Sequence, residues 1–154
     1  MEIIYRPIGV IHSPYRDMAP FQPDENDASG PFILELEPLY ASGLDGLRRG
    51  RYVIILFHIH RARGYDGSNL AHPPSLNGGT TGLFASRSPN RPNAIGLDVA
   101  RILDIQENRV YTTGLSAIDG TPLLDLKPYI EGDRKELISV GHQERVPALP
   151  EARG

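Results

Sequence analysis

Cysteine is absent from the 154-residue chain. Its absence excludes disulfide bonds, thiolate nucleophiles and zinc sites built on thiolates. Long hydrophobic runs are missing as well: the longest purely apolar run is Val53–Phe57, whereas a membrane-spanning helix needs about 20 residues. The first residues, Met1–Arg6, have neither the basic start nor the apolar core of a secretory signal. These absences predict a soluble, cytoplasmic protein with no membrane partner.

The chain also lacks an excess of positive charge. It has 16 Lys and Arg against 19 Asp and Glu, a formal net charge of -3. This balance disfavours nucleic-acid binding through overall charge but allows a local basic patch. Such a patch would form if two groups of arginines met in the fold, namely Arg48, Arg49 and Arg51 and, farther along, Arg61 and Arg63.

Common cofactor and catalytic signatures are absent. The chain has no G-x-G-x-x-G, no P-loop and no G-x-S-x-G elbow, and Gly78–Gly82 has the wrong spacing for a phosphate loop. A Rossmann cofactor site is therefore disfavoured. His58 and His60 are two residues apart on a predicted strand, which places them on one face. Two histidines without a nearby third ligand are weak evidence for a metal, so we expect no metal site.

Glycine and proline are abundant, with 16 and 14 residues. They break long helices and favour short strands joined by turns. Extended structure is predicted for 3–12, 32–37, 52–60, 82–85, 94–105, 110–118 and 123–126. The continuous apolar stretch within 52–60 predicts burial on both faces of that strand. Only 44–50 has helical character, and 13–31 and 61–81 are predicted as long loops.

Together these segments predict an all-β fold. We expect a single-sheeted β-barrel of six or seven strands with short helical turns and two long loops, because closure removes the edges that short strands would expose. The barrel domain is predicted to cover 1–138, followed by a C-terminal tail over 139–154.

Two turns are dense in residues that could bind a ligand. In the stretch 87–93, RSPNRPN, two prolines restrict the backbone and two guanidiniums offer planar forks suited to carboxylate or phosphate. Solvated arginines, or arginines paired with acids, would be an equally good interpretation. The turn Asp119–Pro122 fits ordinary turn chemistry, and it could also present backbone groups to a ligand.

Three longer strings carry a resemblance to a known family. They are IGVIHSPYR (8–16), FASRSPNRPNAIGLDVARIL (84–103) and AIDGTPLLDLKPYI (117–130). In this order and spacing they closely resemble the signatures of the TsaA-like family, of the YaeB and TrmO type. The similarity extends over nearly the whole chain up to about Tyr129.

The resemblance implies a methyltransferase that uses S-adenosyl-L-methionine without a Rossmann fold. Family members form homodimers of single-sheeted barrels, with the cofactor near the subunit contact. The activity implied is methylation of N6 of threonylcarbamoyladenosine at position 37 of tRNA, in the anticodon loop. Two alternatives remain open: an S-adenosyl-L-methionine-binding module without tRNA methylation, and a methyltransferase for a small molecule.

The resemblance also implies site residues. Those expected to bind the cofactor are Pro20, Phe21, Gln22, His58, Ile59, Arg87, Leu97, Asp119, Gly120, Thr121 and Pro122. Phe21 stands where the family commonly has arginine, so a stacking or apolar contact would replace a cationic one. Asp119 and His58 are the candidates for a catalytic base, and neither is preferred. Substrate-binding residues are expected to be Arg61, Arg63 and Arg91.

Overall fold

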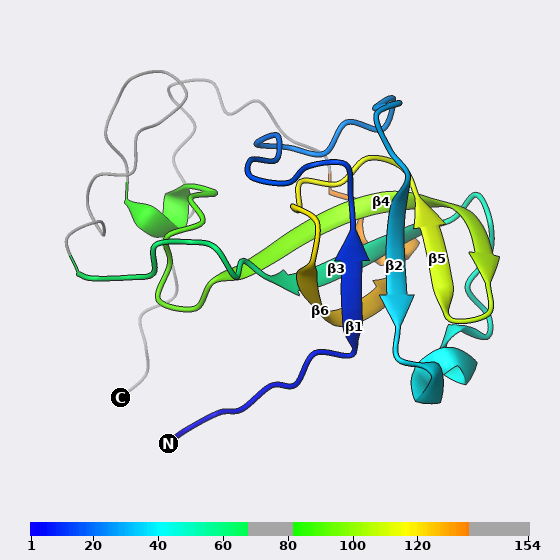
Figure 1. The fold of residues 1–154 in the computed structure, drawn as a ribbon, viewed down its shortest axis with the longest axis horizontal. Coiled ribbons are helices and arrows are strands. Elements are labelled where there is room, and N and C mark those ends of the chain that lie inside the picture. Colours follow the sequence, from blue (N-terminus) through cyan, green and yellow to red (C-terminus); the bar gives the residue numbers. More distant parts are fainter. Residues whose placement is uncertain (68–81, 136–154) are drawn as a thin grey trace, which may run out of the picture.

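The structure is a computed structural model that describes residues 1–67 and 82–135. Its framework is a ring of six strands (Figure 1). Every neighbouring pair is antiparallel, and the order β1-β2-β5-β4-β3-β6 closes on itself because β6 also pairs with β1. The strands are β1 (Gly9–His12), β2 (Phe32–Leu36), β3 (Tyr52–His58), β4 (Ile95–Gln106), β5 (Arg109–Thr112) and β6 (Thr121–Pro128).

Alternation of apolar and polar residues explains why these segments close around a core. In β2, Phe32, Leu34 and Leu36 are buried while the two residues between them are half-buried. The other strands direct their alternate side chains inward in the same way, as expected for a sheet with one buried face. The predicted all-β barrel is confirmed, with six strands. Its core comprises Ile11, Phe32, Leu34, Leu36, Leu44, Val53, Ile55, Phe57, Ala100, Ile102, Val110, Leu115, Ala117 and Leu123.

Strand β3 differs from the expectation of burial on both faces. Val53, Ile55 and Phe57 are buried inside the barrel, but Ile54 and Leu56 are only half-buried on its outer surface. The expectation is wrong within the described part of the chain, because the strand lies in a barrel wall whose outer side is left partly open. An apolar outer face is therefore available for a partner.

Several boundaries also differ from the predictions. Residues 82–85 were expected to be extended, but Leu83–Ala85 forms the 3-10 helix η2. Helical structure near 44–50 lies mostly earlier, in η1 (Pro38–Leu44). The strand expected from residue 3 begins at Gly9, since Pro7 has no N–H to donate and residues 1–7 are exposed.

The later part of the barrel shows one further difference. The strand expected over 110–118 ends at Thr112, and the chain then follows an irregular path to β6. A short 3-10 helix, η3 (Glu131–Asp133), follows the last strand. The first long loop, 13–31, contains no helix or strand, as predicted.

Some predictions fall on parts of the chain that the structure does not describe. The domain boundary at 138 and the tail over 139–154 lie there, as does most of the second loop, 68–81. Within the two described ranges, no helix is long and apolar enough to cross a membrane. The same ranges contain no group of three or more histidines, cysteines and acids that could hold a metal.

Candidate functional site

A cavity of about 600 Å³ lies at the end of the barrel where β3 stops and β4 begins. Its size falls within the roughly 300–1,000 Å³ typical of small-molecule sites. Five parts of the chain line it: residues 17–21, the end of β3 with residues 59–62, the segment around η2, the start of β4, and the stretch before β6. In Figure 1 the loop after β1 and the η2 segment lie beside this end of the barrel.

Gly96 shapes the cavity from the barrel wall. A Cβ atom at Gly96 would lie 2.1 Å from the ring of Phe57, a distance that real side chains do not reach. Glycine therefore allows the Phe57 ring to lie against β4, where both residues line the cavity. Apolar side chains of Ile59 and Ile118 add to the lining.

The loop after β1 carries Pro20 and Phe21 into the cavity lining and is held across the barrel by its acidic residues. Glu25 accepts hydrogen bonds from the Tyr52 hydroxyl at 2.8 Å and from Arg101 Nε at 2.7 Å. The Tyr15 hydroxyl donates to the carboxylate of Asp27. A loop of this length needs such ties because ordering each residue costs about 1–2 kcal/mol of conformational entropy.

Arg91 organises the turn that follows η2. Its Nη1 donates to the carbonyl oxygens of Leu83, Ser86 and Ser88 at 3.4, 3.0 and 3.2 Å. Its guanidinium also lies 5.7 Å from the centre of the Phe84 ring, within the range of a cation–π contact. The predicted rigid turn therefore uses one of its two guanidiniums to bind its own backbone.

Arg87, the other guanidinium of this turn, is more available. Its Nη2 donates to the carbonyl oxygen of Leu97 at 3.2 Å, which docks the turn on β4. This is the hydrogen bond that the described structure gives the Arg87 side chain, so donors of its fork remain to face the cavity that it lines.

Asp98 is a buried carboxylate directly behind the cavity wall, and only 2% of its surface is exposed. It accepts the backbone N–H of Ser116 at 2.7 Å and the Ser116 hydroxyl at 2.6 Å. Burial raises the pKa of Asp98 above its ordinary value, while the two bonds from Ser116 and the charge of Arg87 oppose that rise. Asp98 thus joins β4 to the stretch 115–118, of which Ser116 lines the cavity.

Sequence reasoning missed Asp98, although a signal was present. It occupies an inward position of β4, in alternation with the buried residues Gly96, Ala100 and Ile102. An acid in an inward position of a strand must find hydrogen-bond donors, because an unpaired buried carboxylate is costly. That pattern alone marks Asp98 as a residue with a structural or functional partner.

The turn before β6 uses much of its backbone internally. The N–H of Asp119 donates to the Tyr15 carbonyl at 2.6 Å, and the N–H of Gly120 donates to the Ile11 carbonyl at 2.9 Å. The Asp119 carboxylate accepts the N–H of Ser13 at 3.1 Å. Gly120 has a φ of 82°, the left-handed region that favours glycine. The turn is therefore fixed against β1 and the loop that follows it.

The structure brings together about half of the residues expected at the site. Those lining the cavity are Pro20, Phe21, Ile59, Arg61, Arg87, Arg91, Leu97 and Thr121. Those outside its lining are Gln22, His58, Arg63, Asp119, Gly120 and Pro122. The first group places three arginines and several apolar side chains around one space, an arrangement suited to a ligand with an anionic group and an apolar body.

The two histidines near the end of β3 occupy different places. His58 is the last residue of the strand and lies on its outer face, paired across the sheet with Ile95. His60 lies beyond the strand and lines the cavity, so the expectation that both share a strand face is wrong. Burial lowers the pKa of His60, and the charges of Arg61 and His58 lower it further. A neutral imidazole at the cavity is therefore favoured near neutral pH.

We predict that Asp98→Asn destabilises the fold by about 1–3 kcal/mol, because an NH2 group, which can only donate, replaces one of the two oxygens that accept from Ser116, whereas a carboxyl keeps an acceptor there even when protonated. The loss should depend on pH. A raised pKa means that folded Asp98 holds its proton more tightly than unfolded Asp98, so wild-type stability falls as the pH rises from the ordinary value of 3.8 through the raised pKa. The Asp98→Asn variant has no carboxyl group at this position, so its stability does not show this fall with rising pH.

The difference in unfolding free energy between wild type and Asp98→Asn should therefore be largest at low pH and shrink as the pH rises. Urea denaturation over this pH range measures it, with Asp45→Asn, an exposed acid, as the control. A difference that grew with pH would contradict the inferred state of Asp98.

Comparison with known proteins gives a consistent result. The tRNA-methyltransferase O N-terminal domain family matches residues 10–133. A Pyrococcus abyssi protein named as a probable S-adenosyl-L-methionine-binding protein is 37% identical over 156 residues, covering 98% of this chain and 82% of that one. The mouse tRNA (adenine(37)-N6)-methyltransferase is 47% identical over 87 residues, or 56% of this chain and 20% of that enzyme.

Solved structures agree with the sequence comparison. A crystal structure of TrmO from Pseudomonas aeruginosa has a TM-score of 0.68 and 30% identity, covering 97% of this chain and 64% of that chain. Another TrmO crystal structure has a TM-score of 0.73 and 29% identity, covering 96% and 66%. With its barrel, its cavity and a family match over most of its length, this chain belongs to the tRNA-methyltransferase O N-terminal domain family.

Proposed function

We propose that this protein transfers a methyl group from S-adenosyl-L-methionine to N6 of threonylcarbamoyladenosine at position 37 of tRNA. The observation that carries the proposal is the cavity at the barrel end, where Arg87, His60 and Thr121 meet around a largely apolar space. Relatives named as S-adenosyl-L-methionine-binding proteins and as tRNA (adenine(37)-N6)-methyltransferases support it. This chain spans only 20% of the mouse enzyme, so the activity in that enzyme's name is a proposal for this chain.

The residues present fit the cofactor. Phe57, Ile59 and Leu97 supply apolar surface for an adenosyl group, and Arg87 supplies a cationic fork for the carboxylate of its amino-acid end. Phe21 adds an aromatic face from the loop after β1. When bound, the cofactor supplies an already activated methyl group. Holding donor and acceptor in line is then the main task of the protein, and orientation contributes on the order of 7–11 kcal/mol.

A proton must leave the acceptor nitrogen, whose lone pair is delocalised into the carbamoyl group. Of the two bases expected from sequence, Asp119 and His58, neither lines the cavity. His60 does line the cavity, and its lowered pKa favours the neutral imidazole, which can accept a proton. We therefore assign proton acceptance to His60. A positioned base contributes about 10²–10⁴-fold in rate.

We propose that the protein forms a homodimer through the open outer face of β3 and β4. Three cross-strand pairs expose apolar side chains there: Ile54 with Val99, Leu56 with Leu97, and His58 with Ile95. Contiguous apolar surface on a folded domain marks an interaction site. Leu97 belongs both to this face and to the cavity lining, so a partner seated on the face would lie beside the cofactor site.

We predict that purified protein methylates tRNA that carries threonylcarbamoyladenosine at position 37, and leaves tRNA with unmodified adenosine there unmethylated. Transfer of labelled methyl groups, followed by mass spectrometry of nucleosides, measures both reactions. Saturable cofactor binding without transfer to either tRNA would favour a binding module instead. Transfer to free threonylcarbamoyladenosine as efficient as to tRNA would favour a small-molecule enzyme.

We expect His60→Asn to lower the methyl-transfer rate by about 10²-fold, since the proton acceptor is lost. In wild type the rate should fall as the pH drops through the lowered pKa of His60, because protonated imidazole cannot accept a proton. The parallel variant His58→Asn tests the alternative base that the sequence suggested, against the assignment of His60 from the structure. Rates at saturating cofactor across pH 5–8 measure both, and a larger loss in His58→Asn would contradict the assignment.

We predict that Val99→Glu converts the homodimer to a monomer, because a charge on the outer face would be buried without a partner. Val99 is 38% exposed in the single chain, so the substitution leaves the core intact. Leu39→Glu, on an exposed position of η1, is the control. Light scattering after gel filtration measures the mass, and an unchanged dimer in Val99→Glu would remove this face as the interface.

A further inference from the structure

A basic turn lies between η1 and β3, away from the cavity. Its side chains are Arg48, Arg49 and Arg51, all exposed, and we call them the distal basic turn. Arg48 and Arg51 form no ion pair with any described residue. Arg49 lies close enough to Asp104 for its charge to contribute to lowering the pKa of that acid, after hydrogen bonds from Gln106 and Ile105. Most of the positive charge of the turn is therefore unpaired.

The backbone of this turn is fixed to the barrel. The N–H of Gly50 donates to the Ile102 carbonyl at 2.8 Å, and the N–H of Ile102 donates to the Arg51 carbonyl at 2.8 Å. Within the turn, the N–H of Arg51 donates to the Arg48 carbonyl at 3.1 Å. Gly50, with a φ of 87°, takes the left-handed conformation that the turn requires. The guanidiniums thus extend from a rigid base.

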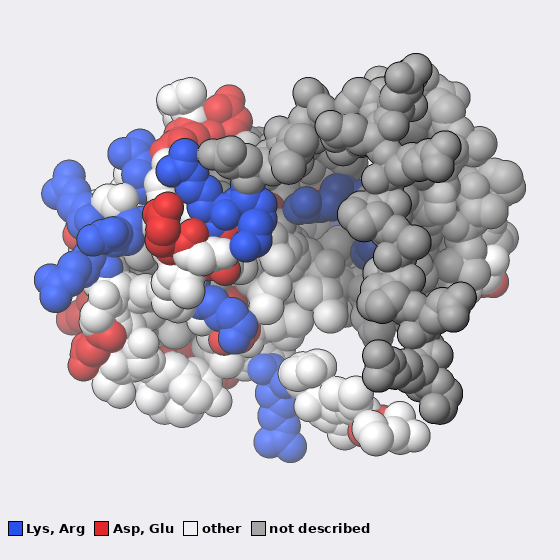
Figure 2. Space-filling view, turned by 180° about the vertical axis from the view of Figure 1, so that it is seen from behind, with Lys and Arg blue, Asp and Glu red and all other residues white. Residues whose placement is uncertain are grey.

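The surrounding surface is rich in cations. Figure 2 shows Lys and Arg gathered over the left part of the described surface, with acidic side chains among them. Arg101 pairs across the sheet with Tyr52, the residue that follows Arg51, and its charge is matched there by Glu25. The patch forms although the whole chain has a net charge of -3.

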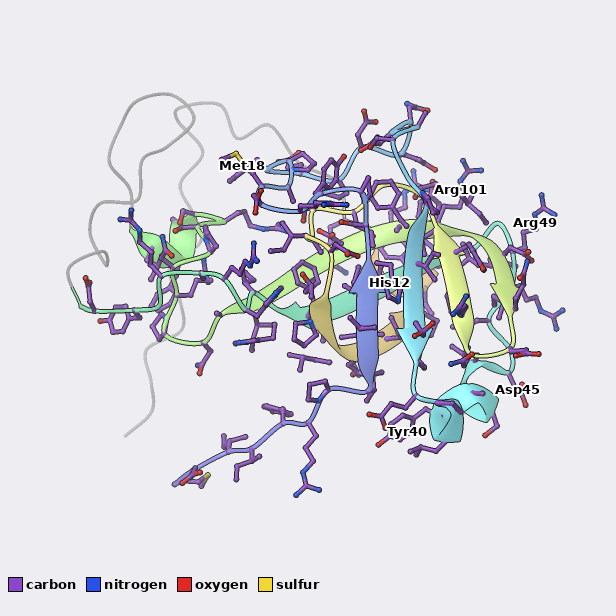
Figure 3. All side chains as sticks on the ribbon, in the orientation of Figure 1. His12, Met18, Tyr40, Asp45, Arg49 and Arg101 are labelled. Atoms are coloured by element: carbon purple, nitrogen blue, oxygen red, sulfur yellow. The ribbon has the colours of Figure 1, made fainter. Side chains whose placement is uncertain are left out.

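The two arginine groups seen in the sequence do not converge. Arg51 precedes β3, whereas Arg61 follows it and lines the cavity. Seven strand residues at about 3.3 Å each separate the two groups by about 23 Å. In Figure 3, Met18 on the cavity loop and Arg49 lie toward opposite ends of the barrel. The distal basic turn is therefore too far away to bind the cofactor or the reacting base.

We propose that the distal basic turn binds the phosphate backbone of the tRNA at a point remote from the methylated nucleotide. This inference rests on the proposed function. A span of about 23 Å covers several nucleotide steps of an RNA, so one RNA can reach both places. Arginine forks match phosphate oxygens, and contacts to phosphate fix the orientation of a nucleic acid without reading its sequence. The turn orients the stem while the cavity receives the loop.

The test compares Arg48→Gln/Arg51→Gln with Arg6→Gln/Lys135→Gln, which removes the same charge at exposed positions that form no ion pair with a described residue. Fluorescence anisotropy measures binding of labelled tRNA over a range of KCl concentrations, and calorimetry measures cofactor binding. Each lost phosphate contact lowers the slope of log K against log[KCl] by about 1. We expect the slope to fall by about 2 and the KM for tRNA to rise at least about tenfold in the first variant only, with unchanged cofactor affinity and unchanged kcat.

An unchanged slope and KM in Arg48→Gln/Arg51→Gln would overturn the inference and leave the methylation proposal intact. An equal loss in both variants would also overturn it, because the effect would then follow net charge rather than this turn. Conversely, a wild type that binds tRNA through the turn but methylates none would support the inference while refuting the proposed function.

Discussion

Closure of a six-strand sheet is the constraint on which the rest of the structure depends. It is completed by β1, a strand of only four residues that pairs with β2 on one side and β6 on the other. The contact is close: a Cβ atom at Gly9 would lie 2.0 Å from the Glu35 carbonyl oxygen. Closure removes the open edges of short strands and fixes one rim on which irregular segments can dock.

Polar side chains then hold those segments on the rim. Asp98 ties β4 to Ser116, Arg91 collects three carbonyl oxygens of its own turn, and Glu25 joins the first loop to the barrel. Each bond contributes only about 0.5–3 kcal/mol, but together they fix the cavity walls before any ligand arrives. Preformed walls reduce the ordering cost of binding and orient a reacting group. In the proposed function, short turns on a barrel take the place of the helix and glycine loop of a Rossmann site.

The fold was largely predictable because its signals are local. Glycine and proline punctuation and alternating strands such as β2 indicate many short strands, and the family strings indicate how they are arranged. Prediction failed where tertiary packing decided the outcome. The apolar run of β3 implied two buried faces, but its outer face is half-open, and η2 is a helical turn where apolar residues suggested a strand.

The site was predictable only in part, for a geometric reason. The chain turns away from the sheet after His58, so the cavity receives His60 and Arg61 instead. Asp119 and Gly120 use their backbone N–H groups toward β1 and its loop, which keeps them out of the lining. Asp98 became evident only when its inward position and its bonds to Ser116 were known. Which residues line the cavity therefore depends on where a strand ends and on which hydrogen-bond donors pair with which acceptors.

The most direct test of the central claim is a crystal structure of the protein grown with S-adenosyl-L-homocysteine. The account predicts density for that molecule in the cavity at the ends of β3 and β4, with its carboxylate on the Arg87 guanidinium and Phe57 and Leu97 against its apolar parts. Density at any other place, with this cavity filled by water alone, would contradict the account.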